Sequence, residues 1–107
     1  MTVNAVLEAL AEPSRRRLVE LLRDGEMSVG ELVAGAGLAQ PAVSKHLRVL
    51  KEAGLVEVRR QAQRRLYRIR PEPLAELDAW LEPYRRLWSE RLDLLERHLK
   101  LKETPNP

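Results

Sequence analysis

The chain has 107 residues, of which 44% are hydrophobic and 33% are charged, with a formal net charge of +3. This length and balance indicate one soluble globular domain and argue against a disordered chain. Cysteine is absent, which excludes disulfides, thiolate metal sites and cysteine catalysis and favours a reducing, cytoplasmic location. No apolar run approaches the ~18 residues needed to cross a bilayer, and the first residues lack the pattern of a secretory signal.

Helical periodicity predicts three short helices in the first third of the chain. Apolar residues recur at helical spacing over residues 3–10. A second helix is expected over about residues 13–22, with a proline in the first turn, where its missing N–H costs nothing. Ser28 stands three residues before Glu31, which is the spacing of a capping box, and it therefore opens a third helix.

The next stretch, "QPAVSKHLRVLKEA", predicts a fourth helix over residues 40–53. Val43, Leu47 and Leu50 recur at helical spacing and form its apolar face. Gly54 follows directly and is expected to end the helix.

After this helix the pattern changes to that of strands. The segments "LVEVRR" and "RRLYRI" are rich in β-branched and aromatic residues, and the "QAQ" between them is typical of a hairpin turn. A helical pattern then covers about residues 73–102, where Pro83 is expected to kink or divide the helix. Residues 104–107 are expected to be a flexible tail.

Two helices joined by a short glycine-containing turn and followed by a β-hairpin form a winged helix-turn-helix. The expected fold is therefore mainly α with a small β-hairpin and a long C-terminal dimerisation helix. We expect a single domain over residues 1–103, with the helix-turn-helix at about 28–53, the wing at about 55–70 and dimerisation helices at about 3–10 and 73–102.

The polar face of the fourth helix suits the major groove of DNA. Gln pairs with adenine, Arg and Lys pair with guanine or hold phosphate, and Ser bonds to either. Residues near the start of a recognition helix usually reach base edges, so Gln40, Ser44 and Lys45 are expected to contact bases. Pro41 joins this DNA-binding set, and Arg48 is expected to read a base or a phosphate. The alternative is an ordinary solvated helix face.

His46 lies between the apolar and polar faces of the same helix. No second metal ligand stands near it in the sequence, so a packing role or a phosphate contact is expected before metal binding. We include His46 in the predicted DNA-binding set.

Arginine dominates the predicted wing. A small hairpin cannot bury many guanidinium groups, so several of them must face water or a polyanion. Arg60, Arg64 and Arg65 near the tip are expected to contact DNA phosphate or an adjacent minor groove, and Gln63 a sugar or phosphate. The alternative is a hairpin whose charge only protects a sheet edge from aggregation.

The C-terminal helical region carries more apolar surface than one small wing domain needs to cover. The expected dimer interface combines this region with the first helix and consists of Val3, Val6, Leu10, Trp80, Tyr84, Leu87, Trp88 and Leu95. An intramolecular core is the alternative, and both interpretations can hold together. A two-fold dimer would place two recognition helices about 34 Å apart, which matches successive major grooves.

These features predict a homodimeric, sequence-specific transcriptional regulator that binds a palindromic operator in double-stranded DNA. The alternative is a winged-helix interaction module that binds an acidic protein. An enzyme is not expected, because the sequence lacks a clustered histidine and carboxylate pair and a glycine-rich phosphate loop. No cofactor is expected. The pattern leaves open whether a small-molecule effector exists.

Several segments resemble the ArsR/SmtB family of winged helix-turn-helix repressors. They are "ALAEPSRRRLVELL", "MSVGEL", "LAQPAVSKHLRVLKEAGLVEVRR" and "RRLYRI". The segment "AWLEPYRRLWSERLDLLERHL" is similar to the last helix of the metal-independent, SdpR-like branch. The resemblance implies a homodimeric bacterial regulator, usually a repressor, that reads DNA with the five positions Gln40, Ser44, Lys45, His46 and Arg48 and with the arginine-rich wing.

The chain departs from the family pattern at four places. Val33 and Gly35 stand where metal-sensing members carry cysteine, and the paired acid and histidine ligands of zinc sensors are missing, so no metal site of the known types is expected. Ala39 stands where a capping serine is common, which weakens the start of the recognition helix. Ala62 replaces the common glycine at the wing tip, so a turn that demands positive φ is disfavoured there.

Overall fold

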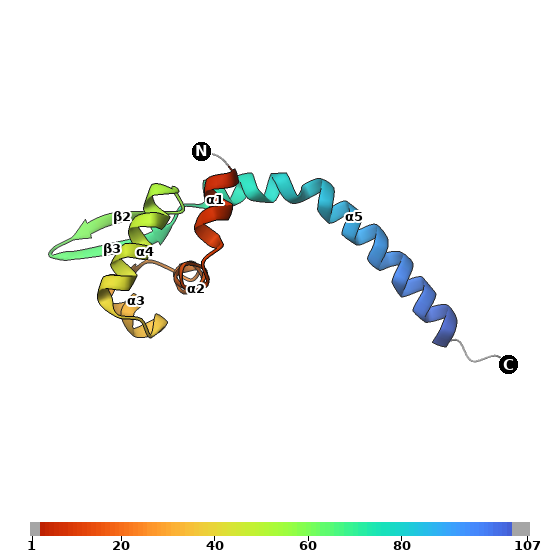
Figure 1. Cartoon of the computed structure of the whole chain (residues 1–107), viewed down its shortest axis with the longest axis horizontal. Coiled ribbons are helices and arrows are strands. Elements are labelled where there is room, and N and C mark those ends of the chain that lie inside the picture. Colours follow the sequence, from red (N-terminus) through yellow and green to blue (C-terminus); the bar gives the residue numbers. More distant parts are fainter. Residues whose placement is uncertain (1–2, 104–107) are drawn as a thin grey trace. The chain divides into compact units, whose positions relative to one another are not determined.

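The computed structural model describes residues 3–103 and shows a winged helix-turn-helix (Figure 1). Its elements are α1 (Val3–Leu10), α2 (Pro13–Leu22), β1 (Met27–Ser28), α3 (Val29–Ala36), α4 (Gln40–Glu52), β2 (Val56–Gln61), β3 (Arg64–Ile69) and α5 (Pro71–Glu103). This confirms the expected fold, which is mainly α with a small β-hairpin. The tail predicted at 104–107 lies outside the described residues.

Two arginines at the start of α2 hold the junction with α1. Arg15 Nε donates a hydrogen bond to the backbone oxygen of Ala9 at 2.6 Å, and Arg16 Nη1 donates to that of Leu10 at 2.8 Å. These carbonyls lie at the end of α1, where a helix leaves its acceptors unpaired. The Glu12 carboxylate accepts from the backbone N–H of Arg15 at 3.0 Å and so caps the first turn of α2.

The predicted capping box is present at the start of α3. Ser28 Oγ accepts from the backbone N–H of Glu31 at 3.2 Å, and the Glu31 carboxylate accepts from the backbone N–H of Ser28 at 2.9 Å. At the other end Gly37 is left-handed, with φ 68°, a conformation that glycine adopts without a steric penalty. Both ends of α3 are therefore fixed by local interactions.

Helix α4 ends in two backbone hydrogen bonds that lead directly into the wing. The N–H of Gly54 donates to the oxygen of Lys51, and the N–H of Leu55 donates to that of Leu50, both at 2.9 Å. Together they form a Schellman motif, whose left-handed residue is Gly54 with φ 78°. Because β2 starts at Val56, this turn sets the direction of the wing relative to α4.

Strands β2 and β3 form the antiparallel hairpin that we call the wing, residues 56–69, and β1 pairs with the other edge of β3. In that second pairing Met27 lies opposite Tyr67 and Ser28 lies opposite Leu66. Strand β1 was not predicted from the sequence, because two residues are too few for a periodic pattern. The short strand ties the segment before α3 to the wing.

The turn of the wing contains two residues, Ala62 and Gln63, and Ala62 is left-handed with φ 56°. The wing tip therefore adopts the turn that alanine was expected to disfavour. A two-residue hairpin needs a left-handed residue to match the twist of its strands. Alanine adopts that conformation at a cost of about 1–2 kcal/mol.

The core lies between the helices and the root of the wing. Its most buried members are Val6, Ala9, Leu18, Leu22, Leu32, Val43, Leu47, Leu50, Leu55, Val56 and Leu66. The three apolar positions predicted on α4 all belong to it. They fix the rotation of α4 about its axis and therefore determine which of its side chains face outward.

The prediction that Val6 lies in a dimer interface is wrong, because its side chain is 0% exposed within the protomer core. Successive helical residues are turned by about 100° around the axis, so the residue after Val6 faces outward. That residue is Leu7, which is 42% exposed. Leu10 is half-buried and packs against the core, and Val3 is half-buried.

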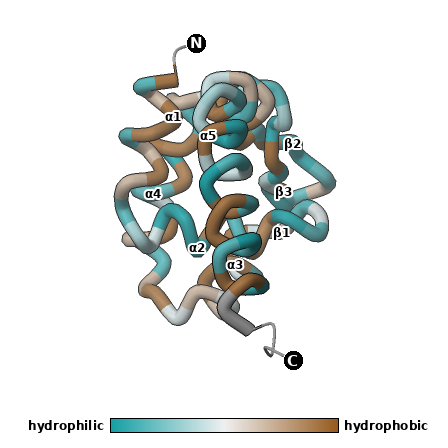
Figure 2. Tube along the Cα trace, turned by 90° about the vertical axis from the view of Figure 1, so that its right-hand side faces the viewer, coloured by the Kyte–Doolittle hydropathy of each residue, from teal (hydrophilic) through white to brown (hydrophobic). Residues whose placement is uncertain are grey.

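Helix α5 starts at Pro71, two residues before the predicted start at 73, and continues to Glu103 without division at Pro83. A proline inside a helix removes one backbone hydrogen bond, and the bonds of the neighbouring turns maintain the helix here. Hydrophobic and hydrophilic residues alternate along α5 (Figure 2). The chain divides into two units, one up to Leu77 and one from Asp78 on. No helix within residues 3–103 is long and apolar enough to cross a membrane.

Candidate nucleic-acid interface

One side of α4 is accessible along its whole length. The predicted contacts on this helix are Gln40, Pro41, Ser44, Lys45 and Arg48, and all of them are exposed. The opposite side of α4 is buried in the core, so the helical period holds these side chains at the surface. A row of amide, hydroxyl, ammonium and guanidinium groups offers the donors that base edges and phosphates accept.

The structure places His46 apart from this row. It follows Ser44 by two positions, which turns it by about 200° around the helix axis. Its side chain is 19% exposed, and its Nε2 lies 3.8 Å from the Glu12 carboxylate, which caps α2. Its Nδ1 is buried and has no hydrogen-bond partner among the described residues. His46 therefore packs between α4 and α2, which is the packing role that the sequence left open.

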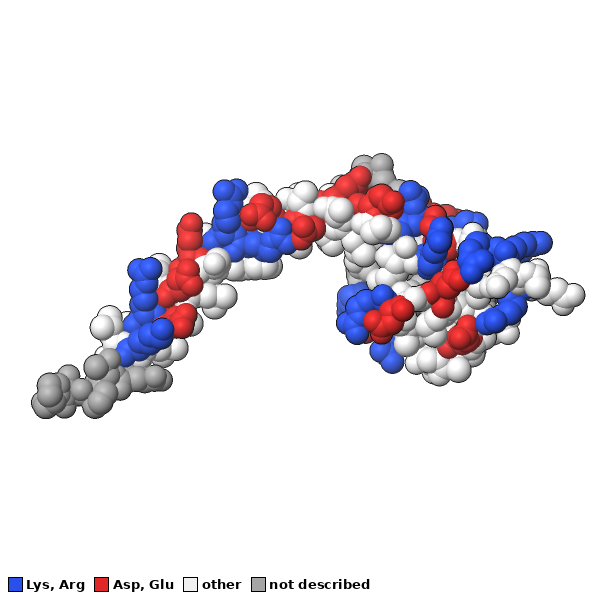
Figure 3. Space-filling view, turned by 180° about the vertical axis from the view of Figure 1, so that it is seen from behind, with Lys and Arg blue, Asp and Glu red and all other residues white. Residues whose placement is uncertain are grey.

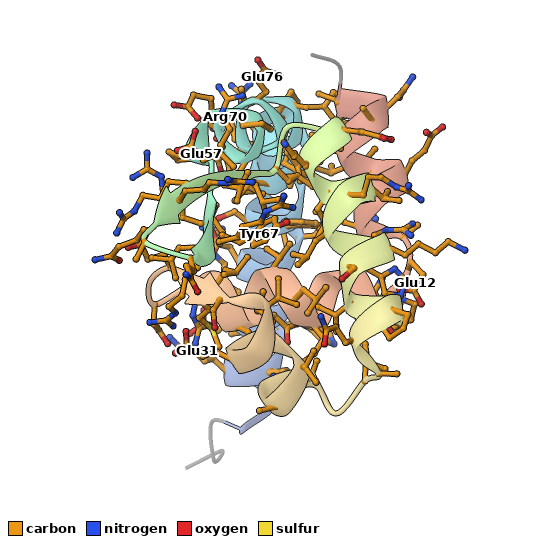
Figure 4. All side chains as sticks on the ribbon, turned by 90° about the vertical axis from the view of Figure 1, so that its left-hand side faces the viewer. Glu12, Glu31, Glu57, Tyr67, Arg70 and Glu76 are labelled. Carbon is orange, nitrogen blue, oxygen red and sulfur yellow. The ribbon has the colours of Figure 1, made fainter. Side chains whose placement is uncertain are left out.

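A hollow of about 450 Å³ lies between α4, the start of α3 and the wing. It is lined by Val29, Gln40, Ser44, Arg48, Lys51, Arg65 and Tyr67. Tyr67 lies between the wing and α4 (Figure 4). The structure thus brings together three predicted residues of the helix and one of the wing on a single concave surface.

Lys51 and Tyr67 line this hollow but were missing from the predicted site. Lys51 could have been predicted from the helical period. It follows Ser44 by seven residues and Arg48 by three, so its side chain continues the same row. Tyr67 was treated only as a strand residue. Tyr67 follows Arg65 by two residues along β3, so the two side chains lie on the same face of the wing.

Basic side chains gather over the wing, with acidic side chains between them (Figure 3). Arg59 Nε donates to the Glu26 carboxylate at 2.8 Å, and Arg64 Nη2 donates to the Glu31 carboxylate at 3.0 Å. Closer to the root, Arg68 Nε donates to Glu57 at 2.6 Å. Arg70 lies 3.9 Å from Glu57 and 3.7 Å from Glu72.

These interactions favour the charged form of two of the acids, Glu26 and Glu31. Hydrogen bonds from Arg59 lower the pKa of Glu26 below its ordinary value of 4.5. The pKa of Glu31 is also lowered, first by the backbone N–H of Ser28 and to a smaller extent by the charge of Arg64. Both carboxylates therefore neutralise their arginine partners. Arg60, Gln63 and Arg65 are exposed and form no ion pair within the described part of the chain.

The unit from Asp78 on carries a broad set of exposed apolar side chains. The predicted interface residues Trp80, Tyr84, Leu87, Trp88 and Leu95 are between 46% and 54% exposed. The rings of Trp80 and Tyr84 lie 5.0 Å apart between centroids, tilted by 42°. On another side of the helix Arg85 binds both Asp78 and Glu82, which raises its pKa.

The α4–wing surface consists of the exposed row of α4 (Gln40, Pro41, Ser44, Lys45, Arg48 and Lys51) and the wing residues Arg60, Gln63, Arg64, Arg65 and Tyr67. Its polar groups are donors and cations rather than a catalytic set. Among the described residues, no group of three or more histidine and carboxylate side chains is placed to hold a metal ion. The arrangement can bind an extended polyanion through charge and hydrogen bonds.

Comparisons with known proteins agree with this geometry. Residues 12–58 match the model of the bacterial regulatory protein, arsR family. The HTH-type transcriptional regulator Rv2034 of Mycobacterium tuberculosis is 44% identical over 85 residues, which are 79% of this chain and 77% of that protein. The transcriptional repressor SdpR of Bacillus subtilis is 29% identical over 79 residues, which are 74% of this chain and 88% of that protein.

A solved structure shows the same fold. The crystal structure of the transcriptional repressor BigR from Xylella fastidiosa superposes with a TM-score of 0.63 at 37% identity and covers 75% of this chain and 85% of that one. The relatives are named as transcriptional regulators, so they do not favour an enzyme or a protein-interaction module. The chain therefore belongs to the arsR family of bacterial regulatory proteins and is a DNA-binding transcriptional regulator.

Proposed function

We propose that two copies of the chain pair through α5 and α1 and present two α4–wing surfaces to one face of a palindromic operator. Binding of the dimer to this operator represses transcription. The observation that carries this proposal is the hollow where the exposed row of α4 meets Arg65 of the wing. A convex recognition helix beside a basic ribbon matches a major groove flanked by phosphates.

Within this surface the two elements have different tasks. Gln40, Ser44 and Lys45 read base edges near the start of α4, and Arg48, one turn later, reads a base or a phosphate. The wing residues Arg60, Gln63 and Arg65 bind the sugar-phosphate backbone, whereas the predicted contact Arg64 is paired with Glu31. Contacts to bases determine sequence preference, whereas contacts to phosphate position the protein on every sequence.

Pairing rests on the apolar residues of α5. Trp80, Tyr84, Leu87, Trp88 and Leu95 are each about half-exposed. Burying a large apolar side chain contributes about 1.5–3 kcal/mol relative to leaving it in water. On α1 the exposed Leu7 and the half-buried Leu10 and Val3 offer a second apolar set for pairing. Regulators of this family bind DNA and typically act as dimers, which supports the pairing.

Selection of bound sequences from a random DNA pool tests the proposal. We expect an inverted repeat whose half-site centres lie about 10–10.5 base pairs apart, the spacing of successive major grooves on one face. Recovery of a single unrepeated site, or of no preferred sequence, would contradict it.

The selected duplex then allows a test of the base-reading residues. Ser44→Ala and Arg48→Ala should weaken binding to the selected site, by about 1–3 kcal/mol for a bidentate base contact, and weaken binding to unrelated DNA less. Gel shifts on both duplexes at one salt concentration measure the two effects. Glu52→Ala, at an exposed position in the last turn of α4, is the matched control and should change neither by much. Equal losses on both duplexes would show that α4 does not read bases.

A further inference from the structure

The two faces of the wing differ in charge. Side chains alternate between the faces along each strand, and residues opposite each other across the hairpin share a face. On one face Arg59, Arg64 and Arg68 each donate to a carboxylate, those of Glu26, Glu31 and Glu57. Every arginine of this face therefore has an acidic partner within the protein.

The other face of the wing lies toward α4, and its arginines lack acidic partners within the described residues. The pairs Val56–Ile69 and Val58–Tyr67 occupy it near the root, and Arg60 lies directly opposite Arg65 near the tip. Two like charges in directly opposed positions of a hairpin destabilise it. Within the described part of the chain neither guanidinium forms an ion pair.

A third cation faces the same place from α4. Lys51, in the last turn of that helix, lines a hollow of about 250 Å³ together with Val58, Arg59, Arg60, Arg65 and Tyr67. Lys51 is exposed and, like the two arginines, has no acidic partner among the described residues. Arg59 also lines the hollow, but the Glu26 carboxylate neutralises it. Three positive charges therefore surround a hollow whose other lining is the apolar Val58 and the ring of Tyr67.

We propose that Lys51, Arg60 and Arg65 form a clamp for a phosphodiester group of the DNA backbone. This inference rests on the proposed function, and it assigns the phosphate contacts to three of the many basic residues. Arg59 and Arg64 do not contribute net charge to the contact, because Glu26 and Glu31 neutralise them. The anion removes the repulsion between Arg60 and Arg65, so the free protein keeps an unfavourable pair that becomes favourable on DNA.

The salt dependence of DNA binding measures the number of phosphates that the protein neutralises. The slope of log K against log salt concentration is about −0.9 per phosphate contact on duplex DNA. We expect Lys51→Gln, Arg60→Gln and Arg65→Gln each to flatten the slope, and the triple variant to flatten it by about 0.9, the value for the one phosphate that the clamp holds. The effect should be the same on the selected operator and on unrelated DNA, because a phosphate contact carries no sequence information.

The matched control is the double variant Glu26→Gln with Arg59→Gln, which removes a wing arginine together with its acidic partner and should leave the slope nearly unchanged. Arg65→Lys keeps the charge and should retain the wild-type slope. Arg65→Gln should also keep or raise the melting temperature of the free protein, because it removes a like-charge pair. A variant that binds DNA less well but is not less stable would support the clamp and exclude misfolding as the cause.

The outcomes separate the clamp from the function on which it rests. A steep wild-type slope that all three glutamine variants leave unchanged would overturn the clamp and leave DNA binding intact. A wild-type protein without salt-dependent DNA binding would overturn both. Titration of the protein with inorganic phosphate tests whether the hollow binds a free anion instead. Binding of phosphate that depends on all three residues, with no change of the DNA slope in their variants, would assign the hollow to a free anion and overturn the clamp.

Discussion

The unit up to Leu77 buries or half-buries most of its large apolar side chains, whereas the unit from Asp78 on exposes many of its own. In the first unit Leu18, Leu32 and Leu50 are 0% exposed, and they connect three helices into one core. In the second unit Trp88 is 54% exposed and Leu101 is 76% exposed. The first unit covers its own apolar surface, whereas the second requires another surface to cover it.

The physical reason lies in what each unit contains. Four helices and a hairpin can cover one another, so each contributes an apolar stripe to a common core. A single helix cannot cover its own stripe, and helical stability in proteins comes mostly from packing rather than from propensity. The residues that continue α5 beyond Leu77 therefore identify the part of the chain that we propose a second copy covers.

The largest effect that separates the two units should come from the core of α4. Leu50→Ala removes a fully buried side chain and should lower the free energy of unfolding by about 2–5 kcal/mol. Leu101→Ala, on the exposed helix, should change it by no more than about 0.5 kcal/mol. Urea unfolding followed by circular dichroism measures both. Similar values for the two variants would mean that the units do not differ as described.

A smaller effect should appear in the dissociation constant of the dimer. Trp88→Ala should raise the dissociation constant of the dimer at least tenfold, which is about 1.4 kcal/mol, because the interface loses the contact of a large aromatic side chain. Sedimentation equilibrium measures this constant. Arg86→Ala is the control, because Arg86 lies two positions away and about 200° around the helix axis. A dimer that tolerates Trp88→Ala as well as Arg86→Ala would place the interface elsewhere.

Within the first unit, local caps should matter more than exposed polar residues of the same type. Ser28→Ala removes the acceptor of the α3 capping box and should cost about 0.5–2 kcal/mol of stability. Ser44→Ala, at an exposed position inside α4, should leave stability within about 0.5 kcal/mol of the wild type. Thermal unfolding of the two variants makes the comparison. An equal loss for both would indicate that the capping box does not stabilise α3.

The smallest effect should be a gain. Ala62→Gly relieves the left-handed strain at the wing turn, φ 56°, while it adds entropy to the unfolded chain. The net stabilisation should be about 0.5–1 kcal/mol. A higher melting temperature than that of the wild type would confirm it, and a lower one would show that the turn is not strained.

The sequence predicted the elements that local patterns determine. The bounds of α1 and α2 follow from apolar spacing and from Pro13, and Gly54 marks the end of α4 within one residue. Arginines at the wing and a polar row on α4 were also readable. The family resemblance, which the comparisons confirm, rests on these same segments.

What the sequence could not provide depends on residues that are far apart along the chain. The acids that neutralise Arg59 and Arg64 stand 33 residues earlier, so no local pattern separates these arginines from Arg60 and Arg65. The packing of His46 against Glu12 depends likewise on how α2 and α4 meet. The positions of Val6 and Leu7 differ by one step of a helix, and only the direction of the core decides which of them is buried.

The central claim is that two α4–wing surfaces act together on one duplex. Sedimentation equilibrium of the protein with a duplex carrying the selected site, at saturating protein concentration, tests it most directly. Pairing through α5 predicts a mass that corresponds to two chains on one duplex. A saturated complex with a single chain would contradict it.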